Sequence, residues 1–125
     1  MTDTAGGPLR IKRVYEKADA DDGFRVLVDR LWPRGLTQEA AALDLWLKDV
    51  APSPDLRRWW GHDAERMGEF ADRYRHELDG SPAVETLREA ISSHPTVTLL
   101  YAARDPEVNH ARILRDWLDG TRQPP

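Results

Sequence analysis

The chain contains two hydrophobic segments, residues 26–28 and residues 96–103. The second segment includes two threonines. A short continuous apolar run is typical of a strand that is buried on both faces of a parallel sheet. Each run is followed by a turn and then by a helical pattern. Strands that alternate with helices indicate an α/β domain, so we predict that both runs are central strands of one sheet.

Two further segments predict strands. Residues 9–16 alternate imperfectly between apolar and basic residues, and residues 43–50 alternate strictly, as a half-buried strand does. We therefore expect a single α/β domain over residues 9–119, with about four mainly parallel strands and helices on both faces, between flexible ends at 1–8 and 120–125. The link between the first two strands is too short for a full crossover helix, so an antiparallel arrangement of that pair stays open.

Capping residues and apolar positions at helical spacing predict five helices. These helices begin after Thr37, Ser53, Asp63, Ser81 and Asp105. The third is the clearest, because apolar residues recur between positions 67 and 78 with the spacing of one helix face. Glycines at 61, 80 and 120 are placed to end the second, third and last of these helices.

Composition narrows the classes of function. The chain has 125 residues and no cysteine, which excludes disulfides, thiolate nucleophiles and all-cysteine metal sites. No signal-peptide pattern is visible at the start of the chain, and no apolar run approaches the ~20 residues that span a bilayer. We therefore expect a cytoplasmic protein with no membrane association. No cluster of histidine, aspartate and glutamate has metal-ligand spacing, so neither a metal nor another cofactor is predicted.

The charge of the chain points to small anions more than to nucleic acid. The net charge is −4, which does not favour non-specific binding to nucleic acid but does not exclude it. Arginine nevertheless supplies 15 of the 18 basic residues. Its planar fork suits carboxylate and phosphate, although a GC-rich genome is the simpler explanation for the excess.

Charged residues follow both apolar runs at their carboxyl ends, where open α/β sheets place ligands. If the two strands are parallel neighbours, these residues meet at one edge of the sheet. The start of the last helix adds free N–H donors and a positive partial charge. Together they predict an anion site for phosphate or carboxylate. The candidate anion ligands are Arg30, Arg34, Arg104 and Asn109.

His110 is the candidate acid–base residue at that edge, because histidine titrates near neutral pH without a shift. Asp29 is its candidate partner. Its carboxylate could orient the imidazole ring, or it could simply pair with a neighbouring arginine.

Aromatic residues give two further candidate features. Trp32, Trp46 and Tyr101 are candidates for the wall of the anion pocket. Trp46 belongs, with the Trp59-Trp60-Gly-His run, to a second group that could stack on a base or a sugar. Because tryptophan is usually buried, the favoured interpretation is that this second group forms core.

Three segments carry a family resemblance: VDRLWPRG, LDLWLKDVAPSPDLRRWWGHD, and LLYAARD with Asn109-His110. From about Ile11 to Leu118 the chain resembles the YeaO-like family of small bacterial proteins, a subfamily of a larger domain family of unknown function. The resemblance implies no established activity. Relatives in the larger family have Asp-x-Arg-like and Cys-His-Arg-like motifs. Asp29-Arg30 matches the first approximately, and the second lacks its cysteine and arginine here.

Two functions remain open from the sequence. The leading hypothesis is an anion-binding α/β protein that acts on a phosphorylated or nucleotide-like small molecule. The alternative is a non-catalytic binding module for nucleic acid or for a protein partner. The sequence gives no oligomeric state, and it contains no helix-turn-helix pattern that would support DNA recognition.

Overall fold

The computed structural model describes residues 9–122; residues 1–8 and 123–125, where flexible ends were predicted, lie outside the described residues. Within that range the strands are β1 (Leu9–Arg13), β2 (Phe24–Leu27), β3 (Leu45–Trp46) and β4 (Val97–Tyr101). The α-helices are α1 (Gln38–Ala41), α2 (Pro54–Trp60), α3 (Met67–Leu78), α4 (Pro82–Ser93) and α5 (His110–Arg122). Short 3-10 helices lie at Ala20–Asp22, Lys48–Val50 and Ala64–Arg66.

The four strands form one sheet in the order β1-β4-β2-β3, and every pairing is parallel. This confirms the predicted α/β class and the central position of both apolar runs. It also settles the open question about the first two strands, because β1 and β2 lie on either side of β4 and are both parallel to it. The link over residues 14–23 returns the chain to the start of β2 through a turn at residues 14–15 and one 3-10 helix, without an α-helical crossover.

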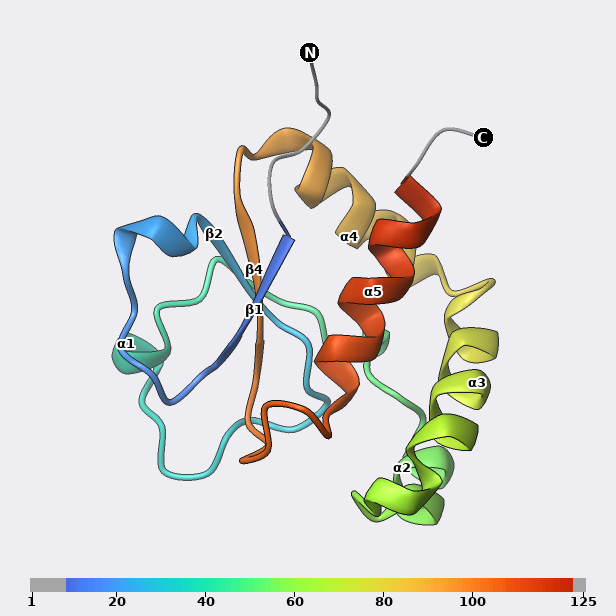
Figure 1. The fold of residues 1–125 in the computed structure, drawn as a ribbon. Helices are drawn as coiled ribbons and strands as arrows, with labels where there is room; N and C mark the ends of the chain where they lie inside the picture. Colours follow the sequence, from blue (N-terminus) through green and yellow to red (C-terminus); the bar gives the residue numbers. More distant parts are fainter. Residues whose placement is uncertain (1–8, 123–125) are drawn as a thin grey trace.

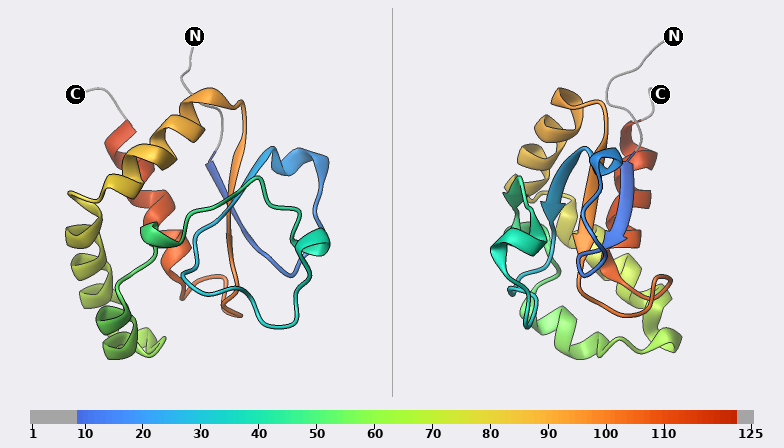
Figure 2. Two further views of the ribbon diagram at one scale, coloured as in Figure 1. Left: turned by 180° about the vertical axis from the view of Figure 1, so that it is seen from behind. Right: turned by 90° about the vertical axis from the view of Figure 1, so that its left-hand side faces the viewer.

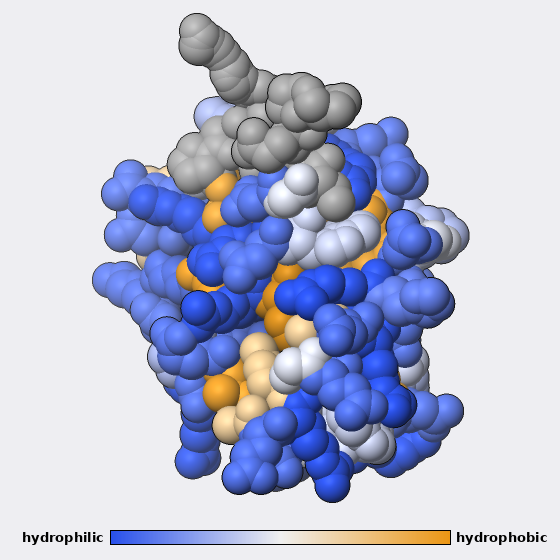
Figure 3. Space-filling view, turned by 45° about the vertical axis from the view of Figure 1, so that its right-hand side comes forward, coloured by the Kyte–Doolittle hydropathy of each residue, from blue (hydrophilic) through white to orange (hydrophobic). Residues whose placement is uncertain are grey.

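The two faces of the sheet are covered unequally (Figures 1 and 2). Helices α3, α4 and α5 lie on one side of the sheet, over a core that includes Val26 and Leu99. On the other side, α1 and the connecting segments cover a smaller core around Leu27 and Leu100. The helical side is mostly hydrophilic outside, and hydrophobic residues show only in a narrow band between polar ones (Figure 3).

Local signals placed most helix ends correctly. Thr37 caps α1 and Ser53 caps α2, each by accepting a hydrogen bond from a backbone N–H of the first turn. Gly61 ends α2 in the left-handed conformation, as predicted. Asp63 caps the 3-10 turn that leads into α3 rather than α3 itself.

Two predicted elements are different in the structure. The strand expected over residues 43–50 is only β3, because β2 ends at Leu27 and Leu47 N–H makes the last bond to it, at 2.9 Å from the Leu27 oxygen. Helix α5 is capped by Asn109, whose Oδ1 accepts from the Arg112 N–H at 2.9 Å. Asp105 instead caps the turn before α5. The helix continues past Gly120 to Arg122.

A buried charged network ties the amino end of the sheet together. Asp22 is 4% exposed and accepts hydrogen bonds from Lys12 and from the guanidinium of Arg25. Arg25 also donates to the Ala41 oxygen at 2.7 Å, which fixes α1 against the sheet. Burial raises the pKa of Asp22, but the Asp19 backbone N–H, Lys12 and Arg25 outweigh it and lower that pKa below its usual range.

We expect Gly23→Ala to lower the free energy of unfolding by about 2–4 kcal/mol, measured by urea denaturation. Gly23 has φ 65°, and an added Cβ would lie 2.3 Å from the Thr96 oxygen. Gly35→Ala is the matched control, because Gly35 has φ 75° but open space around it. That control should cost only about 1 kcal/mol. Equal losses in the two variants would contradict the steric explanation.

Asp22 should make stability fall in acid. Folding lowers the pKa of Asp22. The contribution of Asp22 to the free energy of unfolding is therefore complete above the ordinary carboxyl pKa and is lost as the pH falls below about 4. Asp22→Asn should remove that part of the acid dependence and destabilise the protein by about 3–5 kcal/mol at pH 7, since Lys12 and Arg25 lose their counter-charge. Urea denaturation from pH 3 to 7 measures both effects, and an unchanged acid slope would contradict the assignment.

Candidate functional site

Asp29 lies two residues after the end of β2 and is held by hydrogen bonds from two sides. Its Oδ2 accepts a hydrogen bond from the Ala102 N–H at 3.1 Å, just beyond β4. Its backbone oxygen accepts from the Trp46 Nε1–H at 2.8 Å, at the end of β3. The carboxylate is therefore fixed at the place where the carboxyl ends of β2, β3 and β4 meet.

His110, the first residue of α5, faces Asp29. Its Nε2 lies 3.0 Å from the Val28 oxygen and 3.3 Å from Asp29 Oδ1. A carbonyl oxygen only accepts, so Nε2 carries the proton and donates it to Val28. The ring of Tyr74 packs edge-on against the imidazole at 6.1 Å, and its hydroxyl donates to the Val50 oxygen at 2.6 Å. His110 is thus held in one orientation.

A small cavity of about 60 Å³ opens beside this pair, and we call it the strand-end cavity. It is lined by Asp29, Arg30, Leu31, Ala51, Pro52, Arg57, Trp60 and His110. Two buried polar atoms at this cavity, Asp29 Oδ1 and Arg30 Nε, have no hydrogen-bond partner within residues 9–122. Native proteins rarely leave such atoms unpaired, so the cavity is suited to water or to a small polar guest.

Arg30 is only partly neutralised by the protein. Its terminal nitrogens lie 3.8 Å from Asp49 Oδ1 and 3.4 Å from the Ala51 oxygen, and Asp49 is largely exposed to solvent. Both are long contacts and contribute little. The guanidinium therefore retains hydrogen-bonding capacity toward the cavity.

The sequence did not single out Arg57, and it treated Trp60 as core. Trp60 is indeed buried at 1% exposure and stacks on Phe70, which confirms the core interpretation for this residue. The other edge of Trp60 lines the cavity, and Arg57, one helical turn earlier on α2, lines it too. The sequence signal that could have revealed Arg57 is its position three residues before Trp60, because this spacing places both residues on the same face of a helix.

The surroundings of His110 oppose its protonation. Burial lowers the pKa of the imidazole, and electrostatic interactions with His62 and Arg57 act in the same direction. Asp29 and the Val28 carbonyl raise that pKa without outweighing burial. In the unliganded protein His110 is therefore neutral near pH 7.

Several predicted anion ligands lie elsewhere. Arg34 is exposed within the turn that it forms with Gly35, where its backbone oxygen accepts from the Tyr15 hydroxyl at 2.8 Å, and it does not line the strand-end cavity. The turn carries the chain away from the carboxyl edge, toward α1. Asn109 is fully buried and is used as the cap of α5, with its Nδ2 donating to the Asp105 oxygen at 2.9 Å.

The predicted aromatic walls also lie outside the strand-end cavity. Trp32 donates to the Leu36 oxygen at 2.7 Å and packs edge-on against Trp46 at 5.4 Å, on the side of α1. Tyr101 lines a separate open cleft of about 520 Å³ beside β1. Side chains in strands alternate between faces, so Tyr101 and its neighbours cannot all point to one pocket.

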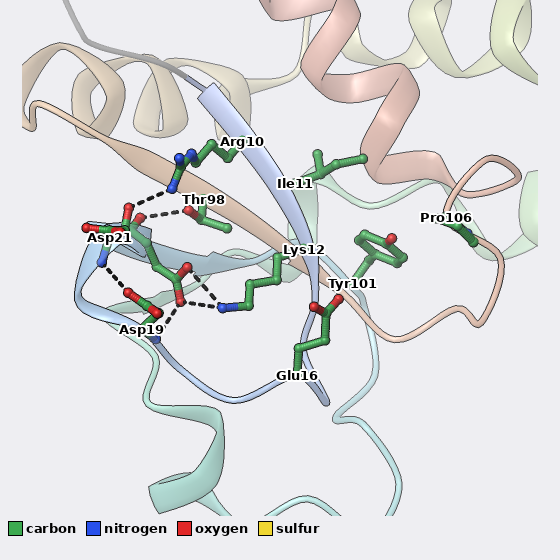
Figure 4. A pocket seen from close by; sticks show the side chains of 10 residues that line it. Arg10, Ile11, Lys12, Glu16, Asp19, Asp21, Thr98, Tyr101 and Pro106 are labelled. Atoms are coloured by element: carbon green, nitrogen blue, oxygen red, sulfur yellow. Dashed lines mark hydrogen bonds and ion pairs between the residues drawn. The ribbon is translucent and has the colours of Figure 1, made fainter.

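Figure 4 shows the cleft beside β1. Arg10 and Lys12 extend from the strand toward Asp19 and Asp21, while Tyr101 lies on the other side of β1. Lys12 donates to both oxygens of Asp22 at 3.1 Å, and Arg10 donates to the Asp21 backbone oxygen at 2.9 Å. Because these groups satisfy one another, the cleft offers less free charge than its composition suggests.

Arg104, the remaining predicted ligand, lines another cleft of about 350 Å³, which we call the loop cleft. The loop cleft is lined by His62, Ala64, Ala103, Arg104, Asp105 and Val108. The ring of His62 stacks on Trp60 with centroids 4.6 Å apart, so the loop cleft adjoins the wall of the strand-end cavity. The structure therefore brings Asp29, Arg30 and His110 together at one cavity and places Arg104, which was predicted for the same site, one cleft away.

The described chain has neither a metal-binding cluster nor a membrane-spanning helix. No group of three or more His, Cys, Asp or Glu side chains in residues 9–122 is arranged to hold a metal ion. In the same part of the chain no helix is both long enough and apolar enough to cross a membrane.

The family is established by comparison with known proteins. A family model described as the inactive DUF488-N3 subclade matches residues 8–123. The chain belongs to this family. Uncharacterised protein Rv3073c of Mycobacterium tuberculosis is 46% identical over 112 residues, covering 90% of this chain and 94% of the relative. Uncharacterised protein YeaO of Escherichia coli is 38% identical over 115 residues, covering 88% of this chain and 96% of the relative. No solved structure matches.

These matches confirm the resemblance to YeaO that three sequence segments indicated. They cover 94% of the Mycobacterium tuberculosis relative and 96% of the Escherichia coli relative. Neither relative's name states an activity, and the function must be argued from the site.

We expect stability to fall as the pH is lowered below about 6.5, because of His110. Folding lowers the pKa of His110, so the unfolded chain takes up a proton before the folded chain does as the pH falls. The contribution of neutral His110 to the free energy of unfolding is therefore lost as the pH falls toward the folded-state pKa. His110→Gln should flatten the dependence of unfolding free energy on pH between 5 and 7. His76→Gln, at an exposed position on α3, is the control and should keep the wild-type slope. A wild-type slope in His110→Gln would contradict this assignment.

Proposed function

We propose that this protein binds a small oxyanion, such as phosphate or a carboxylate, in the strand-end cavity without catalysing a reaction. The observation that carries the proposal is the Nε of Arg30, a buried cationic donor with no partner within residues 9–122. Buried donors of this kind are costly unless they are paired, and oxyanions are the natural partners of guanidinium groups.

Other charges at the cavity support an anion. Arg57 lines it, and the guanidinium of Arg57 makes no hydrogen bond or ion pair with another residue of the described chain. The first turn of α5, at His110, adds the positive partial charge of a helix N-terminus. The wall of the strand-end cavity contains one carboxylate, that of Asp29, so it carries more positive than negative charge.

The two unpaired atoms also specify the form of the ligand. Arg30 Nε requires an acceptor, whereas Asp29 Oδ1 requires a donor. A singly protonated oxyanion, such as hydrogen phosphate, offers both. Protonation of His110 would add a proton to Nδ1, because Nε2 already donates to the Val28 oxygen, and the positive charge of the ring would favour an anion. We therefore infer that binding strengthens as the pH falls toward 6.

The size of the cavity limits the ligand. Pockets that bury drug-sized molecules have volumes of about 300–1,000 Å³. The strand-end cavity, at about 60 Å³, admits an oxyanion group but not a whole nucleotide. A nucleotide-like ligand would enter only through one phosphate, and the proposal is therefore restricted to the anionic group.

One observation favours binding over catalysis. The family model that matches this chain is described as inactive. We therefore keep the anion-binding part of the leading hypothesis and infer that no reaction is catalysed on the bound anion.

We expect phosphate to raise the melting temperature of the wild-type protein above its value in chloride at equal ionic strength. Phosphate at 100 times its dissociation constant would contribute about 2.7 kcal/mol. Arg57→Gln should lose most of this gain, because it removes a cation that lines the cavity.

Arg58→Gln is the matched control. Arg58 is the next residue on α2, its exposed side chain pairs with Asp55, and it does not line the cavity. This variant should keep the full phosphate effect, measured by differential scanning fluorimetry at pH 6 and pH 8. An equal effect in all three proteins would show a general salt effect and would overturn the proposal.

A further inference from the structure

The loop cleft has the features of a second binding position beside the strand-end cavity. Its volume of about 350 Å³ is at the small end of the range for ligand pockets. Ala64, Ala103 and Val108 give it an apolar part, and His62 and Arg104 give it a polar part. A few polar groups on an apolar wall is the usual composition of a small-molecule site.

Arg104 is unused by the fold. Its side chain is exposed, and its guanidinium forms no hydrogen bond or ion pair with any other residue of the described chain. The acidic residue next to it, Asp105, is already engaged, because its Oδ1 accepts from the N–H groups of Glu107 at 2.8 Å and Val108 at 3.2 Å. Arg104 is therefore free to bind an anion from outside the chain.

His62 lies at the boundary between the loop cleft and the strand-end cavity. It lines the loop cleft, and its ring stacks on Trp60, which lines the strand-end cavity. His62 is held at φ 58°, in the left-handed region that costs a non-glycine residue ~1–2 kcal/mol, directly after Gly61 at φ 55°. Strain of this kind is often retained where it places a side chain at a ligand site.

We propose that the loop cleft binds the second anionic group of the same ligand, which makes the ligand a small organic molecule with an oxyanion group at each end. One oxyanion would occupy the strand-end cavity, and the other would pair with Arg104 beside the ring of His62. This inference rests on the proposed function, because it takes the first anionic group to be bound near Arg30. It adds the chemical class of the ligand.

A pair of matched probes tests the second group. 3-Phosphoglycerate and glycerol 3-phosphate share a three-carbon chain and a phosphate, and they differ in having a carboxylate or a hydroxymethyl group at the other end. By isothermal titration calorimetry, we expect 3-phosphoglycerate to bind the wild-type protein about tenfold more tightly, as one charge-assisted contact provides. Inorganic phosphate, titrated in parallel, reports on the strand-end cavity alone.

Substitutions assign the effect to Arg104. Arg104→Gln should abolish the tenfold preference, so that 3-phosphoglycerate and glycerol 3-phosphate bind with about equal affinity. It should leave the affinity for inorganic phosphate unchanged. Arg75→Gln, which alters an exposed arginine of α3 paired with Asp72, should preserve the preference. If phosphate binds but the two organic probes bind equally, or if Arg104→Gln keeps the preference, the loop-cleft inference is overturned. If none of the three ligands binds, the proposed function itself fails.

Discussion

The carboxylate of Asp29 is the constraint on which the functional end of this molecule depends. Parallel strands separate where they end, and the backbone groups there lose their ladder partners. Asp29 replaces a missing partner by accepting from the Ala102 N–H beyond β4, while its own backbone oxygen accepts from Trp46 at the end of β3. Its other carboxylate oxygen lies against His110 at the start of α5. A single residue thus joins three strand ends and a helix, and it lines the strand-end cavity between them.

The opposite end of the sheet handles buried charge in a different way. There Asp22, Lys12 and Arg25 satisfy one another and neighbouring backbone oxygens. At the carboxyl end, by contrast, Asp29 and Arg30 each leave a buried atom without a partner in the described chain. Because buried polar atoms are nearly always paired in folded proteins, this difference is the reason for proposing a ligand at the carboxyl end rather than at the amino end.

The fold was largely predictable from sequence, because the strands and helices follow from local patterns. Continuous apolar runs indicated β2 and β4, and cap residues such as Ser53 and Gly61 fixed the ends of α2. The site was predictable only in part. Residues attached directly to a strand end or a helix start, such as Asp29 and His110, have positions set by those elements. Arg34 lies within a turn, and no local rule states in which direction a turn leads the chain.

Arg57 illustrates why the rest of the site required the structure. It belongs to a short helix whose start and end could be predicted, yet the sequence does not state which end of the sheet that helix covers. In the structure Trp60 packs against Phe70, and Arg57 and His110 line the same cavity at the carboxyl edge. His110 is held by other contacts, because its Nε2 is bound to the Val28 carbonyl and its ring packs against Tyr74. These contacts engage Nε2 and fix the orientation of the ring, which no sequence pattern around His110 could have specified.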